Sequence, residues 1–184
     1  METRHFLTIV LSCALTQRAS AQRQHTEMQF GAGGAQVTGT GYERSGALGG
    51  WLGVEHVWDA VWGARFDVSA LARVVTGSCI EPSPHCGHSV PGNIEAFMVG
   101  GTRRFATFGF ASPLLEVGVE AGVAHVGSST TAPSGAALAT ALTSQAVVLR
   151  VGDARVVLGA QVMLIPNVAG HSLKVFPITL GLRF

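Results

Sequence analysis

The chain has 184 residues, of which 47% are hydrophobic and only 12% are charged, with a formal net charge of +1. A soluble surface usually carries about 25–35% charged residues, so this chain has too few to cover an ordinary water-exposed exterior. The sequence also lacks the basic stripe that nucleic-acid binding requires, and we expect no nucleic-acid partner.

The first 21 residues predict a secretory signal peptide. Arg4 precedes an apolar stretch at residues 6–16, and small residues at positions 19–21 form a cleavage site. This apolar stretch is too short for a transmembrane helix, which needs about 20 residues. We therefore expect an exported protein with one domain over residues 22–184.

Eight segments after the signal peptide alternate between apolar residues and small or polar residues, as β-strands with two different faces do. They cover residues 26–37, 47–57, 61–74, 94–105, 113–126, 138–151, 154–165 and 173–184. Most are longer than a typical globular strand and are long enough for a tilted membrane strand of about 9–11 residues.

The predicted connections alternate in length. Short connections follow the second, fourth and sixth segments, at residues 58–60, 106–112 and 152–153. Longer ones cover residues 38–46, 75–93, 127–137 and 166–172. Short turns at one end and long loops at the other are typical of outer-membrane barrels, whose short turns lie on the periplasmic side.

The final segment has the clearest alternation. One parity is entirely apolar, and its members are Phe176, Ile178, Leu180, Leu182 and Phe184. Alternation alone also fits a soluble, lipocalin-like barrel with an apolar interior. The low charge favours a membrane barrel instead, as does a group of aromatic residues near the predicted periplasmic rim. These aromatic residues are Trp58, Trp62, Phe105, Phe108, Phe110 and Phe184.

With these features, the chain resembles the small eight-stranded outer-membrane barrels of the OmpA/OmpX-like class. The resemblance covers residues 26–184 and is one of layout, except that Gly181, Leu182 and Phe184 match the carboxy-terminal assembly signal of these proteins. It implies an all-β fold, an eight-stranded antiparallel up-and-down transmembrane β-barrel located in the outer membrane. It also implies recognition of the final strand by the barrel-assembly machinery. We expect a monomeric or weakly oligomeric barrel that contacts outer-membrane lipids, and no cofactor, because the sequence has no cofactor motif.

An eight-stranded barrel has an interior just wide enough for its own side chains. The predicted interior charges are Glu55, Arg65, Asp67, Arg73, Glu116, Glu120, Arg150, Arg155 and Arg183. We expect the two signs to pair, because unpaired buried charge is costly. Adjacent Arg103 and Arg104 cannot both point inward. This pattern favours an interior filled by ion pairs, and a narrow selective pore is the alternative.

The segment between residues 75 and 93 contains Cys79 and Cys86, the cysteines that remain after signal-peptide cleavage. In an exported protein such a pair most often forms a disulfide, which is our prediction. Together with His85 and His88 the two cysteines could instead supply zinc ligands, although the spacing matches no standard zinc motif.

His125 and Ser128 lie where the fifth segment enters a loop. Lipid A deacylases with eight-stranded barrels carry a histidine and a serine separated by one residue and followed by an asparagine. Here two residues separate the pair, which places the side chains on opposite faces of a strand, and no asparagine follows. We therefore expect a non-catalytic structural or surface-interaction protein, with a lipid-modifying enzyme as an alternative.

Overall fold

The computed structural model describes residues 24–39, 42–59, 61–74, 92–105, 115–127, 134–168 and 170–184. These residues form the strands β1 (His25–Gly39), β2 (Tyr42–Val57), β3 (Trp62–Val74), β4 (Ile94–Phe105), β5 (Leu115–Val126), β6 (Gly135–Val151), β7 (Ala154–Val168) and β8 (His171–Arg183). Among the described residues, no helix is long and apolar enough to cross a membrane.

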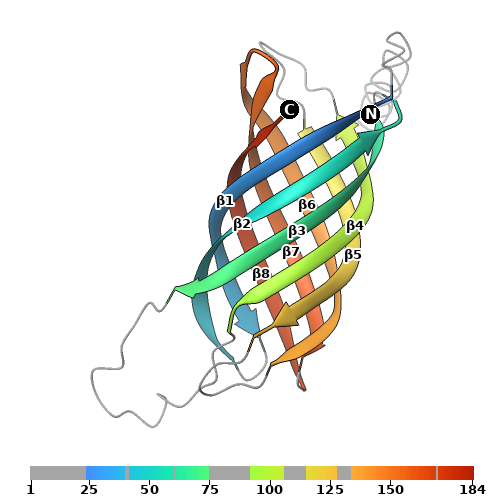
Figure 1. The fold of residues 1–184 in the computed structure, drawn as a ribbon. Helices are drawn as coiled ribbons and strands as arrows, with labels where there is room; N and C mark the ends of the chain where they lie inside the picture. The colour runs from blue at the N-terminus through green and yellow to red at the C-terminus, as the bar shows by residue number, and fades with distance from the viewer. Residues whose placement is uncertain are drawn as a thin grey trace, which may run out of the picture.

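The eight strands form one closed barrel in which each strand pairs antiparallel with the next and β8 pairs with β1. The predicted eight-stranded antiparallel up-and-down fold is confirmed. Figure 1 shows strongly tilted strands, with β1 beginning and β8 ending at the same end of the barrel. We call this the terminal end and the opposite one the distal end.

The strand faces agree with the alternation in the sequence. In β8 the apolar parity points outward, so that Ile178 and Leu180 are 63% and 58% exposed. The other parity points inward, and Val175 and Arg183 are buried. The alternation in β3, β5 and β7 divides the residues between the two faces in the same way.

Several connections differ from the predicted lengths. The strands continue further at the distal end than predicted, so that only residues 40–41 separate β1 from β2 and residues 169–170 separate β7 from β8. The prediction of long connections at 38–46 and 166–172 is therefore wrong. Gly and Asn allow the tight β7–β8 turn, because Asn167 and Gly170 adopt positive φ angles of 57° and 85°.

The first and last strands are joined by side chains as well as by backbone. Phe30 stacks on Phe184 with 5.9 Å between the ring centroids, and the backbone of Phe184 exchanges two hydrogen bonds with Met28. A Cβ atom added at Gly181 would lie 3.1 Å from the Trp51 ring. Gly181 thus leaves room inside the barrel for this large side chain.

Gly122 of β5 lies against the backbone of β4, and its replacement by alanine is expected to destabilise the barrel. The added Cβ would collide with the Phe97 carbonyl oxygen and lie 2.9 Å from the Met98 Cα. Moving a strand to relieve such a collision costs about 1–3 kcal/mol. Urea unfolding should show this loss for Gly122→Ala. Gly101→Ala is the control, since nothing lies within 4 Å of a Cβ there, and an equal loss in both variants would contradict the explanation.

Asp59 stabilises the β2–β3 turn, and we expect this effect to depend on pH. The N–H groups of Trp62 and Val61 donate to Asp59 Oδ1 over 2.8 and 2.7 Å, which holds the Asp59 pKa below its usual value of 3.8. A depressed folded pKa adds stability above the unfolded pKa and loses it as the pH falls through the folded pKa. The urea midpoint of the wild type should therefore exceed that of Asp59→Ala at pH 6.

The difference between these midpoints should shrink below about pH 4, where the carboxylate begins to bind protons. Asp59→Asn retains an oxygen acceptor without the charge, so its midpoint relative to Asp59→Ala should not change over the same range. A constant difference between wild type and Asp59→Ala from pH 6 to pH 3 would contradict the assignment.

Candidate functional site

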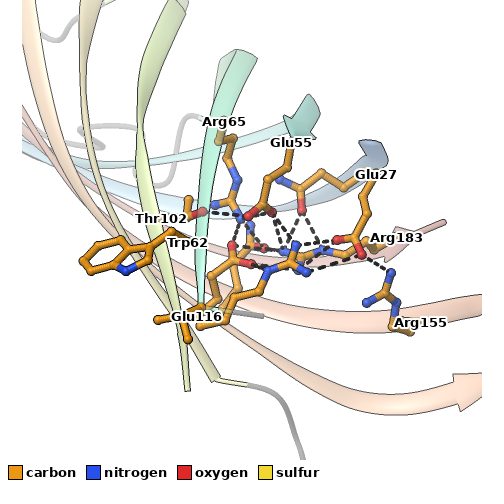
Figure 2. Close-up of polar contacts among 12 residues, drawn as sticks. Glu27, Glu55, Trp62, Arg65, Thr102, Glu116, Arg155 and Arg183 are labelled. Atoms are coloured by element: carbon orange, nitrogen blue, oxygen red, sulfur yellow. Dashed lines mark hydrogen bonds and ion pairs between the residues drawn. The ribbon is translucent and has the colours of Figure 1, made fainter. Parts of the chain in front are cut away.

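The terminal half of the barrel interior holds a group of charged side chains that point toward one another (Figure 2). We call this group the ionic cluster, and its members are Glu27, Glu55, Arg65, Arg104, Glu116, Arg155 and Arg183. They come from every strand except β6, which contributes the neutral Gln145. The alternation of each strand aims these side chains inward, and the barrel closure brings them together.

Glu116 of β5 joins three arginines from different strands. It accepts hydrogen bonds from Arg183 Nη1 and Nη2 over 2.9 and 3.1 Å and from Arg104 Nε over 3.1 Å. Arg65 Nη2 also forms an ion pair with Glu116 Oε1. A carboxylate with this many charge-assisted contacts fixes the relative positions of β3, β4, β5 and β8.

Glu27 and Glu55 extend the network to strands that Glu116 does not reach, namely β1, β2 and β7. Glu27 accepts from Arg104 Nη2 and from Arg155 Nη2, both over 2.5 Å. Glu55 lies 3.2 Å from Arg65 and 3.1 Å from Arg104, and it accepts from the Thr102 hydroxyl over 2.6 Å. Together with Gln145 of β6, which accepts hydrogen bonds from Arg65 and Arg183, the ionic cluster connects all eight strands.

The buried charges are nearly balanced in sign. Asp67 and Glu120 add two acidic groups beside the cluster, at 3.9 and 3.8 Å from Arg65. Removing such charges from water costs several kcal/mol per ion, and opposite charges with good hydrogen-bond geometry offset that cost. A complete network is therefore stable, whereas the loss of any one partner leaves a buried charge without compensation and destabilises the barrel.

The distal half of the interior is apolar. Its buried side chains include Val37, Leu71, Ile94, Val126, Met163, Ile165, Leu173 and Val175. Between this apolar cluster and the ionic cluster lies a cavity of about 50 Å³ lined by residues of both types, among them Asp67, Gln145, Leu71 and Met98. A cavity of this size has room for only a few water molecules.

The structure places most of the predicted interior charges inside the barrel. Those that face the interior are Glu55, Arg65, Asp67, Glu116, Glu120, Arg155 and Arg183, of which Arg155 lies near the rim with 19% of its side chain exposed. The side chain of Arg73 lies outside the part of the chain that the structure describes.

The prediction for Arg150 is wrong, because Arg150 is exposed beside the β6–β7 turn. The β6–β7 register shifts between Val147 and Leu149, as expected for a β-bulge. Val148 and Leu149 are consecutive and both about half exposed, at 53% and 57%. After this bulge Arg150 is in register with Arg155, which already lies near the rim. Arg150 lies one residue before the end of β6, and its side chain stays exposed there.

The sequence reasoning did not identify Glu27, Gln29, Arg104 or Gln145 as interior residues. Parity could have found Arg104, because it shares its face with Thr102, whereas Arg103 shares the face of Phe105. Glu27 and Gln29 carry the same signal in β1. Gln29 Oε1 and Gln145 Oε1 both accept from Arg183.

Some predicted residues lie outside the described part of the chain. These are the signal peptide, the candidate disulfide Cys79 and Cys86 with His85 and His88, and Ser128. Within the described residues, no group of three or more histidine, cysteine, aspartate or glutamate side chains could hold a metal ion.

The residues of the predicted carboxy-terminal assembly signal lie at the end of β8. Gly181 is buried, Leu182 is half-buried and Phe184 is exposed.

The outer surface is covered by exposed apolar side chains from every strand. They include Met28, Leu52, Phe66, Val99, Val119, Leu142, Leu158 and Ile178. Aromatic side chains lie at the terminal end of this surface, where Trp58, Trp62, Phe105 and Phe184 are 37–52% exposed. The predicted rim residues Phe108 and Phe110 lie outside the described residues.

His125 lies on the outer surface at the distal end. Its Cα is paired in register with that of Glu95, and both side chains are exposed. The structure thus brings an acid next to this histidine across two strands, which the spacing in the sequence did not indicate. No hydrogen bond joins these two side chains.

Comparison with solved structures identifies proteins of similar fold. Neisserial surface protein A (NspA) superimposes with a TM-score of 0.63 at 9% sequence identity, over 88% of this chain and 98% of that protein. The chain shares the eight-stranded barrel fold of NspA.

Two further matches are weaker. Ail, the attachment invasion locus protein of Yersinia pestis, has a TM-score of 0.49 at 16% identity, over 89% of this chain and 100% of its own. The outer membrane protein OprG from Pseudomonas aeruginosa has a TM-score of 0.41 at 12% identity, over 88% of this chain and 97% of its own. No protein-family model and no curated protein matches the chain in sequence.

Proposed function

We propose that this chain is an outer-membrane β-barrel protein with a non-catalytic structural or surface-interaction role, and that its interior does not conduct ions. The observation that carries the location is the apolar outer surface, combined with a buried ionic cluster. A water-soluble barrel has the opposite arrangement, with apolar residues inside and charges outside. Lipid is therefore the solvent that suits this exterior.

The filled interior supports the absence of conduction. An ion entering from the terminal end would have to break the contacts among Glu27, Glu116, Arg104 and Arg183. An ion entering from the distal end would have to displace the apolar cluster, where Ile165 and Val175 are fully buried. Both steps are costly, since the first leaves buried charge unpaired and the second strips an ion of water.

Cell fractionation tests the proposed location, combined with gel mobility of boiled and unboiled protein. Recovery in the outer membrane, with a faster band before boiling, is the expected result. Recovery as a soluble periplasmic protein without a mobility shift would reject the membrane barrel in favour of the lipocalin-like carrier. For the refolded protein in planar bilayers, recordings should show no discrete conductance steps, and reproducible steps would reject the closed interior and support the narrow pore.

A second candidate function is a lipid-modifying hydrolase, favoured by the register pairing of Glu95 with His125 on the outer face. A glutamate beside a histidine is the arrangement by which an acid orients a general base. The test compares lipid A mass profiles of cells that overexpress the wild type or His125→Ala. Identical profiles in these cells and in cells with an empty vector would reject the hydrolase, and a wild-type shift that His125→Ala abolishes would replace the non-catalytic role.

A further inference from the structure

Arg103 on the outer face of β4 lies over two aromatic rings at the terminal end. Its guanidinium carbon lies 5.1 Å from the centroid of the Trp62 ring and 5.1 Å from that of the Phe105 ring. Trp62 is the residue paired with Arg103 across the β3–β4 ladder, and Phe105 is two positions along the same strand. Both rings are themselves exposed, at 49% and 37%.

Arg103 has no acidic partner among the described residues. Apart from Arg150 beside the β6–β7 turn, the other charged side chains that are exposed at described strand positions are Glu95 and Lys174, both at the distal end. Aromatic rings contact the face of a guanidinium group and leave the N–H groups at its edge available as donors. A cation close to lipid is stabilised by a nearby anion, and the bidentate geometry of arginine matches a phosphate group well.

The outward face next to Arg103, toward the middle of the barrel, carries small residues. Gly101 follows along the outward face of β4, and a Cβ atom there would meet nothing within 4 Å. Its paired residue on β3 is Ala64, which is also small. Val119 of β5 and His56 of β2 flank this pair in register, and Phe66 lies two positions further along β3. Phe66 and Val119 are 49% and 67% exposed. Two small residues therefore lie between larger exposed side chains next to Arg103.

We propose that Arg103, Trp62 and Phe105 bind the phosphate of a glycerophospholipid in the membrane leaflet at the terminal end, with one acyl chain lying over Gly101 and Ala64. Arg103 pairs with the phosphate, the two rings hold the guanidinium plane in place, and the small residues accommodate the chain. This site rests on the proposed membrane location of the barrel. It assigns a specific lipid contact to one position on a surface that is otherwise largely apolar.

The test measures lipid binding to the refolded, full-length barrel in a non-ionic detergent by native mass spectrometry. Wild type should retain dioleoylphosphatidylglycerol and should not retain dioleoylglycerol, which lacks the phosphate. Arg103→Ala should weaken phospholipid retention about tenfold, the effect expected for loss of a charge-assisted contact. Gly101→Leu, which places a large side chain where the acyl chain would lie, should weaken retention while leaving Arg103 in place. Arg150→Ala is the matched control, because Arg150 is an exposed arginine near the same end.

Equal retention by Arg103→Ala and Arg150→Ala would overturn the proposal, as would equal retention of dioleoylglycerol and the phospholipid. Displacement of the lipid by an equimolar amount of inorganic phosphate would overturn the lipid assignment and leave a simple anion site. Each variant is first tested for insertion into dioleoylphosphatidylcholine vesicles. Failure of the wild type to insert would contradict the membrane location itself, whereas insertion without an Arg103-dependent preference would contradict only the lipid site.

Discussion

Replacing Arg183 with methionine is expected to lower the free energy of unfolding by about 3–5 kcal/mol, the cost of breaking a buried ion pair from one side. Arg183 is 1% exposed and donates to Glu116 over 2.9 and 3.1 Å and to Gln29 over 3.1 and 3.0 Å. Methionine has a similar length but no donors, so Arg183→Met leaves the carboxylate of Glu116 in a low-dielectric interior with fewer compensating charges.

The measurement is urea unfolding of protein refolded into vesicles of dilauroylphosphatidylcholine, which avoids any effect on assembly in the cell. Arg150→Met is the matched control, since Arg150 is an exposed arginine near the same end. Exposed substitutions usually change stability by less than about 0.5 kcal/mol. Similar losses of unfolding free energy in Arg183→Met and Arg150→Met would show that the buried contacts of Arg183 contribute no more to stability than an exposed arginine does.

Replacing Ile178 with arginine is expected to destabilise the barrel in a bilayer by about 2–4 kcal/mol, the cost of a cation on the lipid face near the bilayer midplane. Ile178 lies midway along β8, points outward and is 63% exposed. On a soluble barrel, an exposed isoleucine could be replaced by arginine at little cost. The size of this effect therefore reports which solvent surrounds the barrel.

Ser172→Arg provides the comparison on the same strand and the same face, because Ser172 is exposed at the distal end of β8. Near the membrane interface the cost of arginine falls to about 0–1 kcal/mol. Both variants are compared by urea unfolding in the same vesicles. Equal effects at positions 172 and 178 would indicate that no apolar layer surrounds the middle of the barrel.

Alternation was sufficient to predict the fold and the facing of most residues. The run from Phe176 to Phe184 places every second residue on the outer surface, and the structure agrees at each of these positions. This works because the strand period is two, and a long strand repeats the signal several times. For the same reason Glu116 and Glu120 could be assigned to the interior from β5 alone.

The partners of these charges could not be predicted, because they depend on register between strands far apart in sequence. Arg104 and Glu27 lie 77 positions apart, yet their side chains form a hydrogen bond of 2.5 Å. Arg150 illustrates a different limit. It is in register with the interior residue Arg155, but it lies next to the β6–β7 turn and its side chain is exposed there, and the sequence does not mark where the barrel interior ends.

The pairing of β1 with β8 has a consequence for how the molecule assembles. Gln29 and Arg183 lie 154 positions apart and meet only when the sheet closes on itself. Before that moment an incomplete sheet would carry Glu27 and Arg183 without much of their electrostatic compensation. Partly closed forms are thus less stable than the closed barrel. The last strand completes both the hydrogen-bond ladder and the charge balance in one step. The barrel should consequently form and unravel as an all-or-none unit, without a stable intermediate that lacks its final strand.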